Sequence, residues 1–246
     1  DDMVITISHL GYIKRTPLAD FRQQGRGGIG AKAGAARDED FIEYVHQANM
    51  HSTMMFFTEQ GRLYWTKVYE LPEGNRQSKG RALQNMINIQ KGDKVCAFIH
   101  VKNLSDMEYV QNHYLIFATK NGLMKKTTLE SYSRPRANGI IALGLREDDR
   151  LIRVTLTDGN SQMLVASYNG KVVRFPEDTV RPMGRTATGV RAIKLDEDGK
   201  DRVVGMICVE EGSKDSVLVI SEKGYGKRTL LDDENGEPIY RITNRG

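Results

Sequence analysis

The most regular feature of the chain is a short run of apolar and β-branched residues, followed by a polar turn that glycine closes. In the first example, residues 4–7 precede Gly11, and the next segment ends in basic residues. Two strand-like runs joined by a short turn with glycine are typical of a β-hairpin. The pattern occurs five times, with the closing glycines Gly11, Gly61, Gly122, Gly170 and Gly224.

A second landmark, a basic loop with glycine, follows each hairpin by about 20 residues. A further apolar strand and a closing strand, such as residues 94–99, complete a unit of four strands. The hairpin glycines are about 53 residues apart on average, which is the size of a propeller blade. We therefore predict an all-β, propeller-like fold of repeated four-stranded blades. The loop glycines are Gly30, Gly80, Gly139, Gly189 and Gly246.

The repeat also predicts the domain organisation. We expect one domain over residues 1–246, and the chain to be a C-terminal fragment of a longer one. The sequence does not decide whether strands exchange between blades. The approximate blades are residues 1–52, 53–113, 114–161, 162–215 and 216–246, of which the last is incomplete.

The net charge of +4 conceals an uneven distribution. The five windows that run from each hairpin turn through its basic loop carry 26 of the 36 Lys and Arg residues. They carry only 10 of the 32 Asp and Glu residues, so the windows are strongly positive and the remainder is negative. One charged run is typical of a solvated surface. Five equivalent ones predict a positive surface that binds a polyanion.

Duplex DNA, bound largely without sequence preference, is the predicted partner, because Lys and Arg neutralise phosphates and no recognition helix is evident. The candidate DNA-binding residues are Lys14, Arg15, Arg22, Gln24, Arg26, Lys32, Lys67, Arg76, Lys79, Arg81, Lys125, Lys126, Arg134, Arg136, Arg174, Arg181, Arg185, Arg191, Lys227, Arg228, Arg241 and Arg245.

Other classes of protein find little support. No apolar run approaches the roughly 18 residues of a membrane span. Cys96 and Cys208 lie in apolar strand-like runs and are expected to be small buried residues in a reducing, cytoplasmic setting. The five histidines lack metal-ligand spacing, and Gly226-Lys227-Arg228 lacks the Ser or Thr of a phosphate loop. We expect no catalytic residue, metal or cofactor in this chain.

Residues 22–30 combine glycines with two arginines and two glutamines. Such a backbone tolerates positive φ and close approach of another surface. Taken alone, the segment is more typical of an exposed glycine turn, but its place at the first basic loop favours a DNA contact.

With these features the chain resembles the C-terminal domain of the DNA gyrase A subunit family. That family carries a box of the form Gln-Arg-Arg-Gly-Gly-Lys-Gly. Residues 24–30 match it at five of seven positions, and Gly25 and Ile29 replace its second and sixth residues. Further similar segments are residues 11–14, 61–65, 68–72, 170–175 and 224–229. The box residues are Gln24, Gly25, Arg26, Gly27, Gly28, Ile29 and Gly30.

The resemblance implies a β-pinwheel with about five of six blades present. It also implies that DNA wraps in a positive sense, so that the ATP-dependent holoenzyme, a type II topoisomerase, introduces negative supercoils. The implied partners are the N-terminal catalytic core of the gyrase A chain and the gyrase B chain in an A2B2 assembly. ATP and Mg²⁺ belong to that holoenzyme, which is bacterial, cytoplasmic and nucleoid-associated. The isolated domain is expected to be monomeric, without membrane contact.

Two alternatives stay open at this point. The A subunit of topoisomerase IV has a similar domain with a degenerate or missing box, which would imply decatenation and selection of DNA substrates. A protein-binding propeller is the alternative from another class, although the Trp-Asp and kelch signatures are missing.

Overall fold

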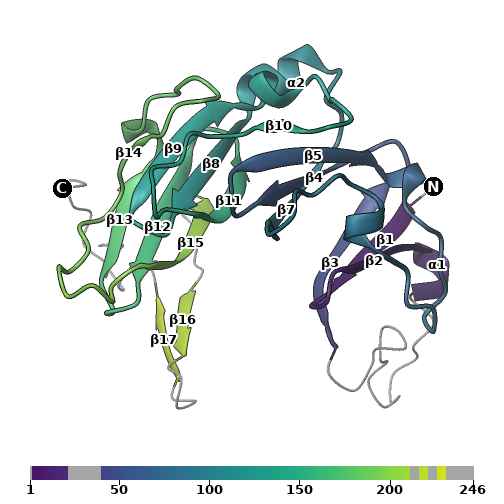
Figure 1. Cartoon of the computed structure of the whole chain (residues 1–246), viewed down its shortest axis with the longest axis horizontal. Helices are drawn as coiled ribbons and strands as arrows, with labels where there is room; N and C mark the ends of the chain where they lie inside the picture. Colours follow the sequence, from purple (N-terminus) through teal and green to yellow (C-terminus); the bar gives the residue numbers. More distant parts are fainter. Residues whose placement is uncertain (1, 22–39, 211–215, 221–225, 231–246) are drawn as a thin grey trace. The chain divides into compact units, whose positions relative to one another are not determined.

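The computed structural model describes residues 2–21 and 40–210, together with the backbone of residues 216–220 and 226–230 (Figure 1). Strands dominate, which confirms the all-β prediction. The helices are short: α1 (Leu18–Phe21), α2 (Met107–Asn112) and the 3-10 turns η1 (Val68–Glu70), η2 (Leu83–Asn85), η3 (Leu129–Tyr132) and η4 (Glu177–Thr179).

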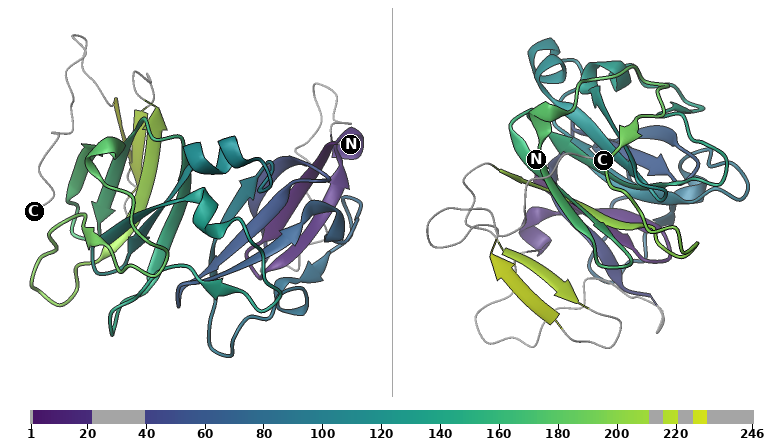
Figure 2. Two further views of the ribbon diagram at one scale, coloured as in Figure 1. Left: turned by 90° about the horizontal axis from the view of Figure 1, so that it is seen from above. Right: turned by 90° about the vertical axis from the view of Figure 1, so that its left-hand side faces the viewer.

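All five predicted hairpins are present, and each is antiparallel (Figure 2). The turn glycines of the first four hairpins have the left-handed conformation that the sequence predicts, with φ of +86° at Gly11 and +93° at Gly122. The hairpins are β1 (Asp2–Ser8) with β2 (Tyr12–Pro17), β4 (Thr53–Thr58) with β5 (Arg62–Lys67), β8 (Tyr114–Thr119) with β9 (Leu123–Thr128), β12 (Ser161–Ser167) with β13 (Val172–Pro176), and β16 (Ser216–Ile220) with β17 (Gly226–Leu230).

A long closing strand pairs with the first strand of each of the first four hairpins. The register shifts at the turn end of every such pair, for example between Ile7 and Ser8. A bulge of this kind increases the local twist of the sheet. The closing strands are β3 (Ile42–Asn49), β7 (Val95–Val101), β11 (Leu151–Thr157) and β15 (Val203–Glu210).

The fourth strand of a sheet comes from the following repeat. β6 (Arg81–Ala82) joins β2, β10 (Ile140–Ile141) joins β5, and β14 (Val190–Arg191) joins β9. The chain thus exchanges strands between repeats, and the sequence units differ from the folded sheets. The resulting orders are β3-β1-β2-β6 for the first sheet, β10-β5-β4-β7 for the second, β11-β8-β9-β14 for the third and β13-β12-β15 for the fourth.

The loop glycines make this exchange possible. A β-carbon at Gly80 would lie 2.3 Å from the carbonyl oxygen of Ile13, and one at Gly189 would lie 2.2 Å from that of Met124. Only glycine therefore allows the incoming chain to approach the hairpin so closely. Each exchanged strand ends with the same hydrogen bond to the hairpin glycine. Leu83 N, Ala142 N and Ala192 N donate to the carbonyls of Gly11, Gly61 and Gly122 over 2.9, 2.7 and 2.7 Å.

The described chain divides into two compact units, and each has a core of its own. The first unit holds the first two sheets, and its core includes Ile5, Ile7 and Phe56. The second holds the later sheets, and its core includes Ile116 and Phe175. The first strands of the first four hairpins are largely buried on both faces, as the six consecutive buried residues of β4 illustrate. Each fully buried large apolar side chain contributes about 1.5–3 kcal/mol to stability.

The two cysteines differ in one respect from the prediction. Cys96 and Cys208 are free thiols on closing strands, but they are half-buried rather than buried. Closing strands have one face away from the core, and both cysteines occupy intermediate positions there.

Candidate nucleic-acid interface

The predicted basic loops are the segments that carry the chain from one repeat onto the sheet of the preceding one. We call residues 72–80, 133–139 and 181–189 the crossover loops. In the first of them, backbone hydrogen bonds of 2.9 Å link Arg15 to Pro72 and Gly74, and Asn75 Oδ1 accepts bonds of 2.9 Å from the two N–H groups of residues 77–78. The loop is therefore held in one shape along its length.

Lys14 anchors the first crossover loop from inside. Its side chain is buried, and Nζ donates hydrogen bonds to the carbonyl oxygens of Asn75, Arg76 and Ser78 at 2.8, 3.3 and 2.8 Å. Burial lowers the pKa of Lys14 below its ordinary value. The three acceptors satisfy the three donors of an ammonium, which makes this burial tolerable.

Lys125 has the same role in the second unit. Like Lys14, it follows a hairpin glycine by three positions, and its side chain is completely buried. Nζ donates to the carbonyl of Ala142 at 2.6 Å, to the hydroxyl of Tyr132 at 3.1 Å and to the carbonyl of Arg185 in the third crossover loop. Burial, and then the nearby charge of Arg185, lower the pKa of Lys125 to about 7.

Four predicted DNA-binding residues are therefore corrected, because their side chains are buried: Lys14, Lys125, Lys126 and Arg174. Lys126 forms a buried ion pair, with Nζ 3.4 Å from Glu177 Oε1 and 4.4 Å from the centre of the Tyr114 ring. Glu177 also accepts hydrogen bonds from Ser161 N at 3.1 Å and from the Thr157 hydroxyl. These four cations lie within the second strands of their hairpins, β2, β9 and β13, and their side chains are shielded from solvent.

Six candidates have exposed side chains, and all six belong to a crossover loop or to the strand that follows it. The ammonium of Lys79 lies 3.8 Å from the centre of the Tyr12 ring, which fixes it at the surface. Exposed cations of this kind can reach a phosphate without breaking internal bonds. They are Lys79, Arg81, Arg134, Arg136, Arg181 and Arg191.

Four more candidates are half-buried and bond to backbone carbonyls. Arg76 donates to Phe21 O at 2.6 Å, and Lys67 donates to His51 O at 3.3 Å. Arg15 donates to Leu71 O at 2.8 Å and pairs with Glu73 at 3.4 Å. Arg185 donates to the carbonyl of Ile141. Each keeps donors beyond the bonds described, since a guanidinium has five N–H groups and an ammonium three.

The remaining candidates lie outside the described side chains. Residues 22–39 and 231–246 are not described, so the box at residues 24–30 has no structural account here. Lys227 and Arg228 lie on β17, of which the backbone alone is described. The candidates in the undescribed segments are Arg22, Gln24, Arg26, Lys32, Arg241 and Arg245.

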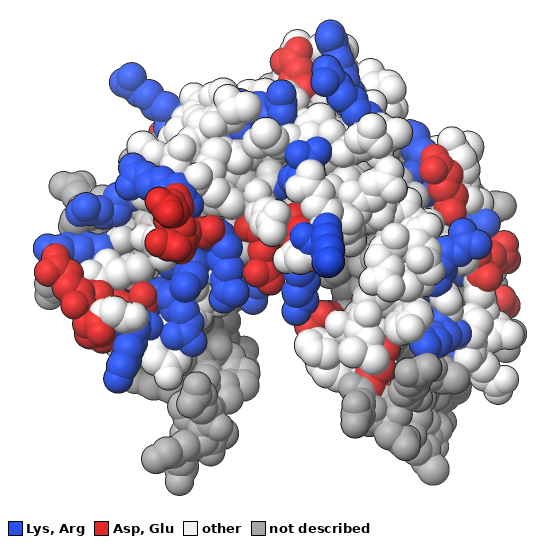
Figure 3. Space-filling model, in the orientation of Figure 1, with Lys and Arg blue, Asp and Glu red and all other residues white. Residues whose placement is uncertain are grey.

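Acidic side chains lie beside the basic ones on the face drawn in Figure 3. One close pair joins Lys171 Nζ and Asp196 Oδ1 at 2.5 Å, and its hydrogen bond raises the pKa of the lysine and lowers that of the carboxyl. Basic and acidic residues are therefore separated along the sequence but mixed on this face of the molecule.

Some of the acids have a structural role that the sequence analysis missed. Asp149 Oδ1 accepts hydrogen bonds from Asn121 N at 2.9 Å and Arg150 N at 2.8 Å, and Asp201 Oδ1 accepts equivalent bonds from Asn169 N and Arg202 N at 3.0 and 3.1 Å. Each aspartate thus ties a hairpin turn to the start of a closing strand. The sequence contains a signal for this role, because an aspartate lies two positions before each of the four closing strands. These residues are Asp40, Asp93, Asp149 and Asp201.

Two other kinds of site are absent from the described part of the chain. Among the described residues, no three or more His, Cys, Asp or Glu side chains are grouped so that they could hold a metal ion. Over the same part of the chain, no helix is sufficiently long and apolar to cross a membrane.

Comparison with known proteins identifies relatives over the whole chain. The DNA gyrase A subunit of Salmonella typhimurium is 45% identical over 233 residues, covering 95% of this chain and 26% of that protein. The DNA gyrase A subunit of Staphylococcus aureus is 43% identical over 246 residues, covering 100% of this chain and 26% of that protein. The chain thus spans about a quarter of the length of these relatives.

Two solved structures share the fold. The C-terminal domain of DNA topoisomerase IV superposes with a TM-score of 0.78 at 27% identity, over 99% of this chain and 72% of that one. The DNA gyrase A C-terminal domain superposes with a TM-score of 0.67 at 24% identity, over 93% and 71%.

The family described as the DNA gyrase C-terminal domain, a beta-propeller, matches residues 2–49, 52–102, 113–158, 162–210 and 215–233. These segments follow the repeats and take in all five hairpins. The prediction from the sequence is confirmed, and the chain belongs to the DNA gyrase C-terminal domain family.

Proposed function

We propose that this chain is the DNA-binding and DNA-wrapping domain of a DNA gyrase A subunit. It would bind duplex DNA through the exposed cations of the crossover loops, largely without sequence preference, and bend the duplex in a positive sense. In the holoenzyme this wrap would present a neighbouring DNA segment for strand passage, so that ATP hydrolysis introduces negative supercoils.

The observation that carries this proposal is the recurrence of exposed cations on loops that the sheets hold rigid. Lys79 and Arg81 belong to the first crossover and Arg181 and Arg191 to the third, and the loops that bear them are anchored by buried lysines. Anchoring matters because a preorganised cation loses less conformational entropy when it binds a phosphate. Smoothly bending 20–30 bp by 40–90° costs about 1–6 kcal/mol, and several such contacts offset that cost.

The decisive experiment measures chirality directly. Nicked circular DNA is incubated with the full-length protein that contains this chain, sealed with ligase and stripped of protein. An increase in linking number that grows with the protein ratio supports positive wrapping, and a decrease would indicate the opposite hand. An unchanged linking number at every ratio would reject it.

The box at residues 24–30 keeps its predicted role within this proposal. Gln24, Arg26 and the four glycines would help to hold the wrap, although Gly25 and Ile29 remove two charges from the family's pattern. Replacing residues 24–30 by alanine should abolish negative supercoiling in the holoenzyme and leave relaxation intact. Full supercoiling by that variant would reject the role of the box.

The wider assembly is also part of the proposal. The N-terminal catalytic core of the gyrase A chain and the gyrase B chain would complete an A2B2 enzyme that uses ATP and Mg²⁺ in the bacterial cytoplasm, next to the nucleoid. The catalytic tyrosine and the ATPase site would lie in those other parts. The domain by itself would be a monomer without cofactor, metal or membrane contact.

Of the alternatives, the topoisomerase IV interpretation is not favoured, because the relatives at 43–45% identity are DNA gyrase A subunits. A protein-binding propeller would predict binding that changes little with salt. DNA wrapping predicts a steep decrease of affinity with salt, since each phosphate contact releases a counterion.

A further inference from the structure

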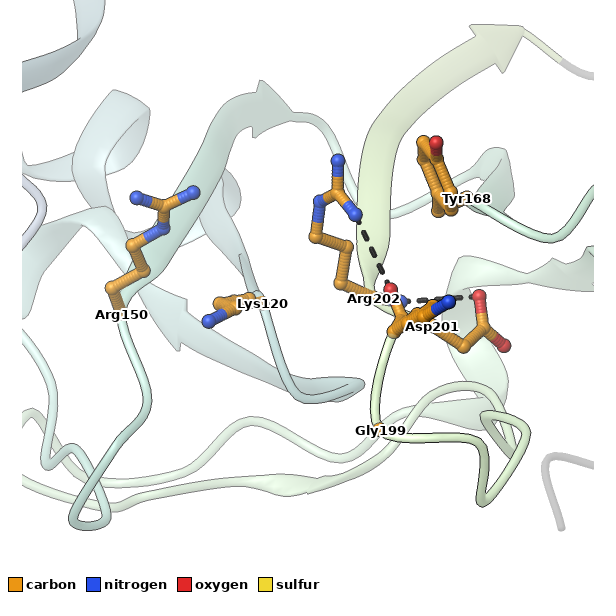
Figure 4. A pocket seen from close by; sticks show the side chains of 7 residues that line it. Lys120, Arg150, Tyr168, Gly199, Asp201 and Arg202 are labelled. Atoms are coloured by element: carbon orange, nitrogen blue, oxygen red, sulfur yellow. Dashed lines mark hydrogen bonds between the residues drawn. The ribbon is translucent and has the colours of Figure 1, made fainter.

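A positively lined hollow of about 390 Å³ lies in the second unit, and none of its lining residues belongs to a crossover loop (Figure 4). Lys120 comes from the β8–β9 turn, Arg150 from the segment before β11, Tyr168 from the β12–β13 turn, and Lys200 and Arg202 from the segment before β15. The wall thus combines two hairpin turns with the starts of two closing strands.

Backbone hydrogen bonds join these segments into one frame. Lys120 N donates to Arg150 O at 2.8 Å, Tyr168 N to Arg202 O at 2.7 Å, and Val203 N to Lys120 O at 2.9 Å. The sheets therefore already fix the backbone that carries these cations. A site on such a frame needs little ordering when it binds a ligand.

Comparison with the equivalent places in other repeats shows what is unusual here. In the first, third and fourth repeats, the residue two positions before the hairpin glycine is hydrogen bonded to the residue before the closing strand. In the first repeat this pair is His9 and Phe41, whose rings stack at 4.7 Å, and in the fourth it is Tyr168 and Arg202, with the guanidinium 4.0 Å from the ring centre. In the third repeat the same pair is Lys120 and Arg150, two cations. Two like charges at one backbone-bonded pair repel, and a bound anion relieves that repulsion.

The acids nearby do not neutralise the hollow. Asp201, the acid of its wall, already accepts backbone hydrogen bonds from Asn169, Asp196 and Arg202. Partial burial raises the pKa of Asp201, but these hydrogen bonds lower it. The net result is a pKa below the ordinary value. Glu59 pairs with Arg150 at 3.5 Å, but both side chains are partly exposed, and screening weakens such pairs. Of the residues that line the hollow, four are cations and one, Asp201, is a carboxylate.

The positive charge of the hollow contrasts with the acidic composition of the chain outside the five windows. Outside the five windows the chain has 22 acidic and ten basic residues, and four of those ten cations line this one hollow. Figure 4 shows Lys120 between Arg150 and Arg202, with the two guanidinium groups on either side. At Gly199, where φ is +73°, a β-carbon would meet nothing within 4 Å, so the floor is open to a ligand.

We propose that this hollow is a phosphate-binding site. Arg150 and Arg202 would contribute planar, paired N–H donors and Lys120 and Lys200 point charges, a combination that fits a phosphoryl group. The site is distinct from the crossover loops, and its occupation does not depend on DNA wrapping. Its ligand is the phosphate of either a DNA backbone or a free polyphosphate.

The test is calorimetric titration of the full-length protein with inorganic tripolyphosphate, in magnesium-free buffer at low salt and without DNA. Lys120→Ala with Arg150→Ala should weaken binding at one site at least tenfold, because each charged hydrogen bond to an anion is worth about tenfold or more. Arg153→Ala with Lys91→Ala removes the same charge from exposed positions outside the hollow and should leave the isotherm unchanged. Lys200→Ala provides an independent single change that does not release Glu59.

Identical isotherms for the wild type and both double variants would overturn the proposal, as would an equal loss in the two double variants. Melting curves confirm that the variants are folded. A repeat of the titration with short duplex DNA present then identifies the source of the phosphate. Competition at this site assigns it to the DNA backbone, and retained binding assigns it to a free polyphosphate. Because the first arm contains no DNA, its failure is separate from a failure of the linking-number assay.

Discussion

The ammonium of Lys14 donates a 2.8 Å hydrogen bond to the carbonyl oxygen of Ser78, which belongs to the next repeat of the chain. The buried ammonium of Lys14 therefore holds the first crossover loop in place. Lys125 makes the equivalent bond to Arg185 in the second unit. The basic residues of this domain therefore divide into internal anchors and external contacts, and the following predictions separate the two roles.

Removing an anchor should destabilise the protein. Lys14→Met keeps most of the side-chain volume but leaves three loop carbonyls without their donor, so we expect the free energy of unfolding to fall by about 2–3 kcal/mol. Urea unfolding measures it. The exposed Lys79→Met is the matched control and should change stability little. Equal losses in the two variants would contradict the anchoring role.

The close approach at Gly189 can be distinguished from simple backbone strain. Gly189 and Gly170 both have positive φ, +103° and +89°, but a β-carbon meets the Met124 carbonyl only at Gly189. Gly170→Ala should therefore cost about 1–2 kcal/mol from conformation alone. Gly189→Ala should cost clearly more, because the exchanged strand β14 must shift. Thermal unfolding of the two variants compares them, and similar melting temperatures would show that the contact is unimportant.

The burial of Lys125 should make the free energy of unfolding depend on pH. Its pKa is lowered to about 7 in the folded protein by burial, from an ordinary value of 10.5 in the unfolded chain. Between these values the unfolded chain binds the extra proton, so the free energy of unfolding should rise with pH, by at most about 1.4 kcal/mol per pH unit. The cost of burying the charge is present in full below pH 7 and lost above pH 10.5.

The measurement is urea unfolding between pH 7 and 9.5, before tyrosines titrate, with Lys125→Met as the comparison. The variant should lack the rise that the wild type shows. Lys79→Met, which removes an exposed lysine, should keep it. Parallel curves for the wild type and Lys125→Met would show that this lysine stays charged throughout the range.

The exposed cations should control DNA binding in proportion to their number. Replacing Arg134 and Arg136 by alanine should weaken binding to all sequences alike and reduce the slope of log K against log salt by about 0.9 for each phosphate that is no longer neutralised. Fluorescence anisotropy over a salt series measures the slope. The control is Arg153→Ala with Lys91→Ala, which should leave the slope unchanged. A slope that changes equally in both variants would refute a specific role for the second crossover loop.

The aspartate caps should contribute to stability through geometry more than charge. Asp149→Ala removes the acceptor for Asn121 N and Arg150 N, at a cost of about 1–2 kcal/mol. Asp149→Asn keeps one carbonyl oxygen at that place and should recover most of the loss. Denaturant midpoints of the two variants decide the matter. If Asn is as harmful as Ala, the charge itself is what matters.

The hairpins were predictable from the sequence because both of their signals are local. A β-branched run and a glycine within a few residues determine the turn at Gly11 or Gly122, and four of the five turn glycines are described with positive φ. The exchange of strands was not predictable. β6, β10 and β14 contain two residues each, which is too short for any hydrophobic periodicity to identify a partner.

The burial of the basic residues was also beyond the sequence pattern. Lys14 and Arg15 are neighbours in the middle of β2, and their side chains point to opposite faces. One is buried under a loop that arrives some 60 residues later, which no local pattern shows. For the same reason the cationic hollow was missed, since Lys120, Arg150 and Lys200 come from segments that lie far apart in the sequence.

The exchange of strands has a consequence for how such a domain can gain or lose repeats in evolution. A deletion that removes one whole repeat, such as residues 114–161, also removes the strand at residues 140–141 that completes the sheet before it. The next repeat then supplies residues 190–191, which follow an equivalent glycine and end with an equivalent hydrogen bond to a turn glycine. Recombination in register thus leaves the sheet before the deletion with a donor strand. The number of repeats can change by unequal crossing-over without a new interface having to evolve.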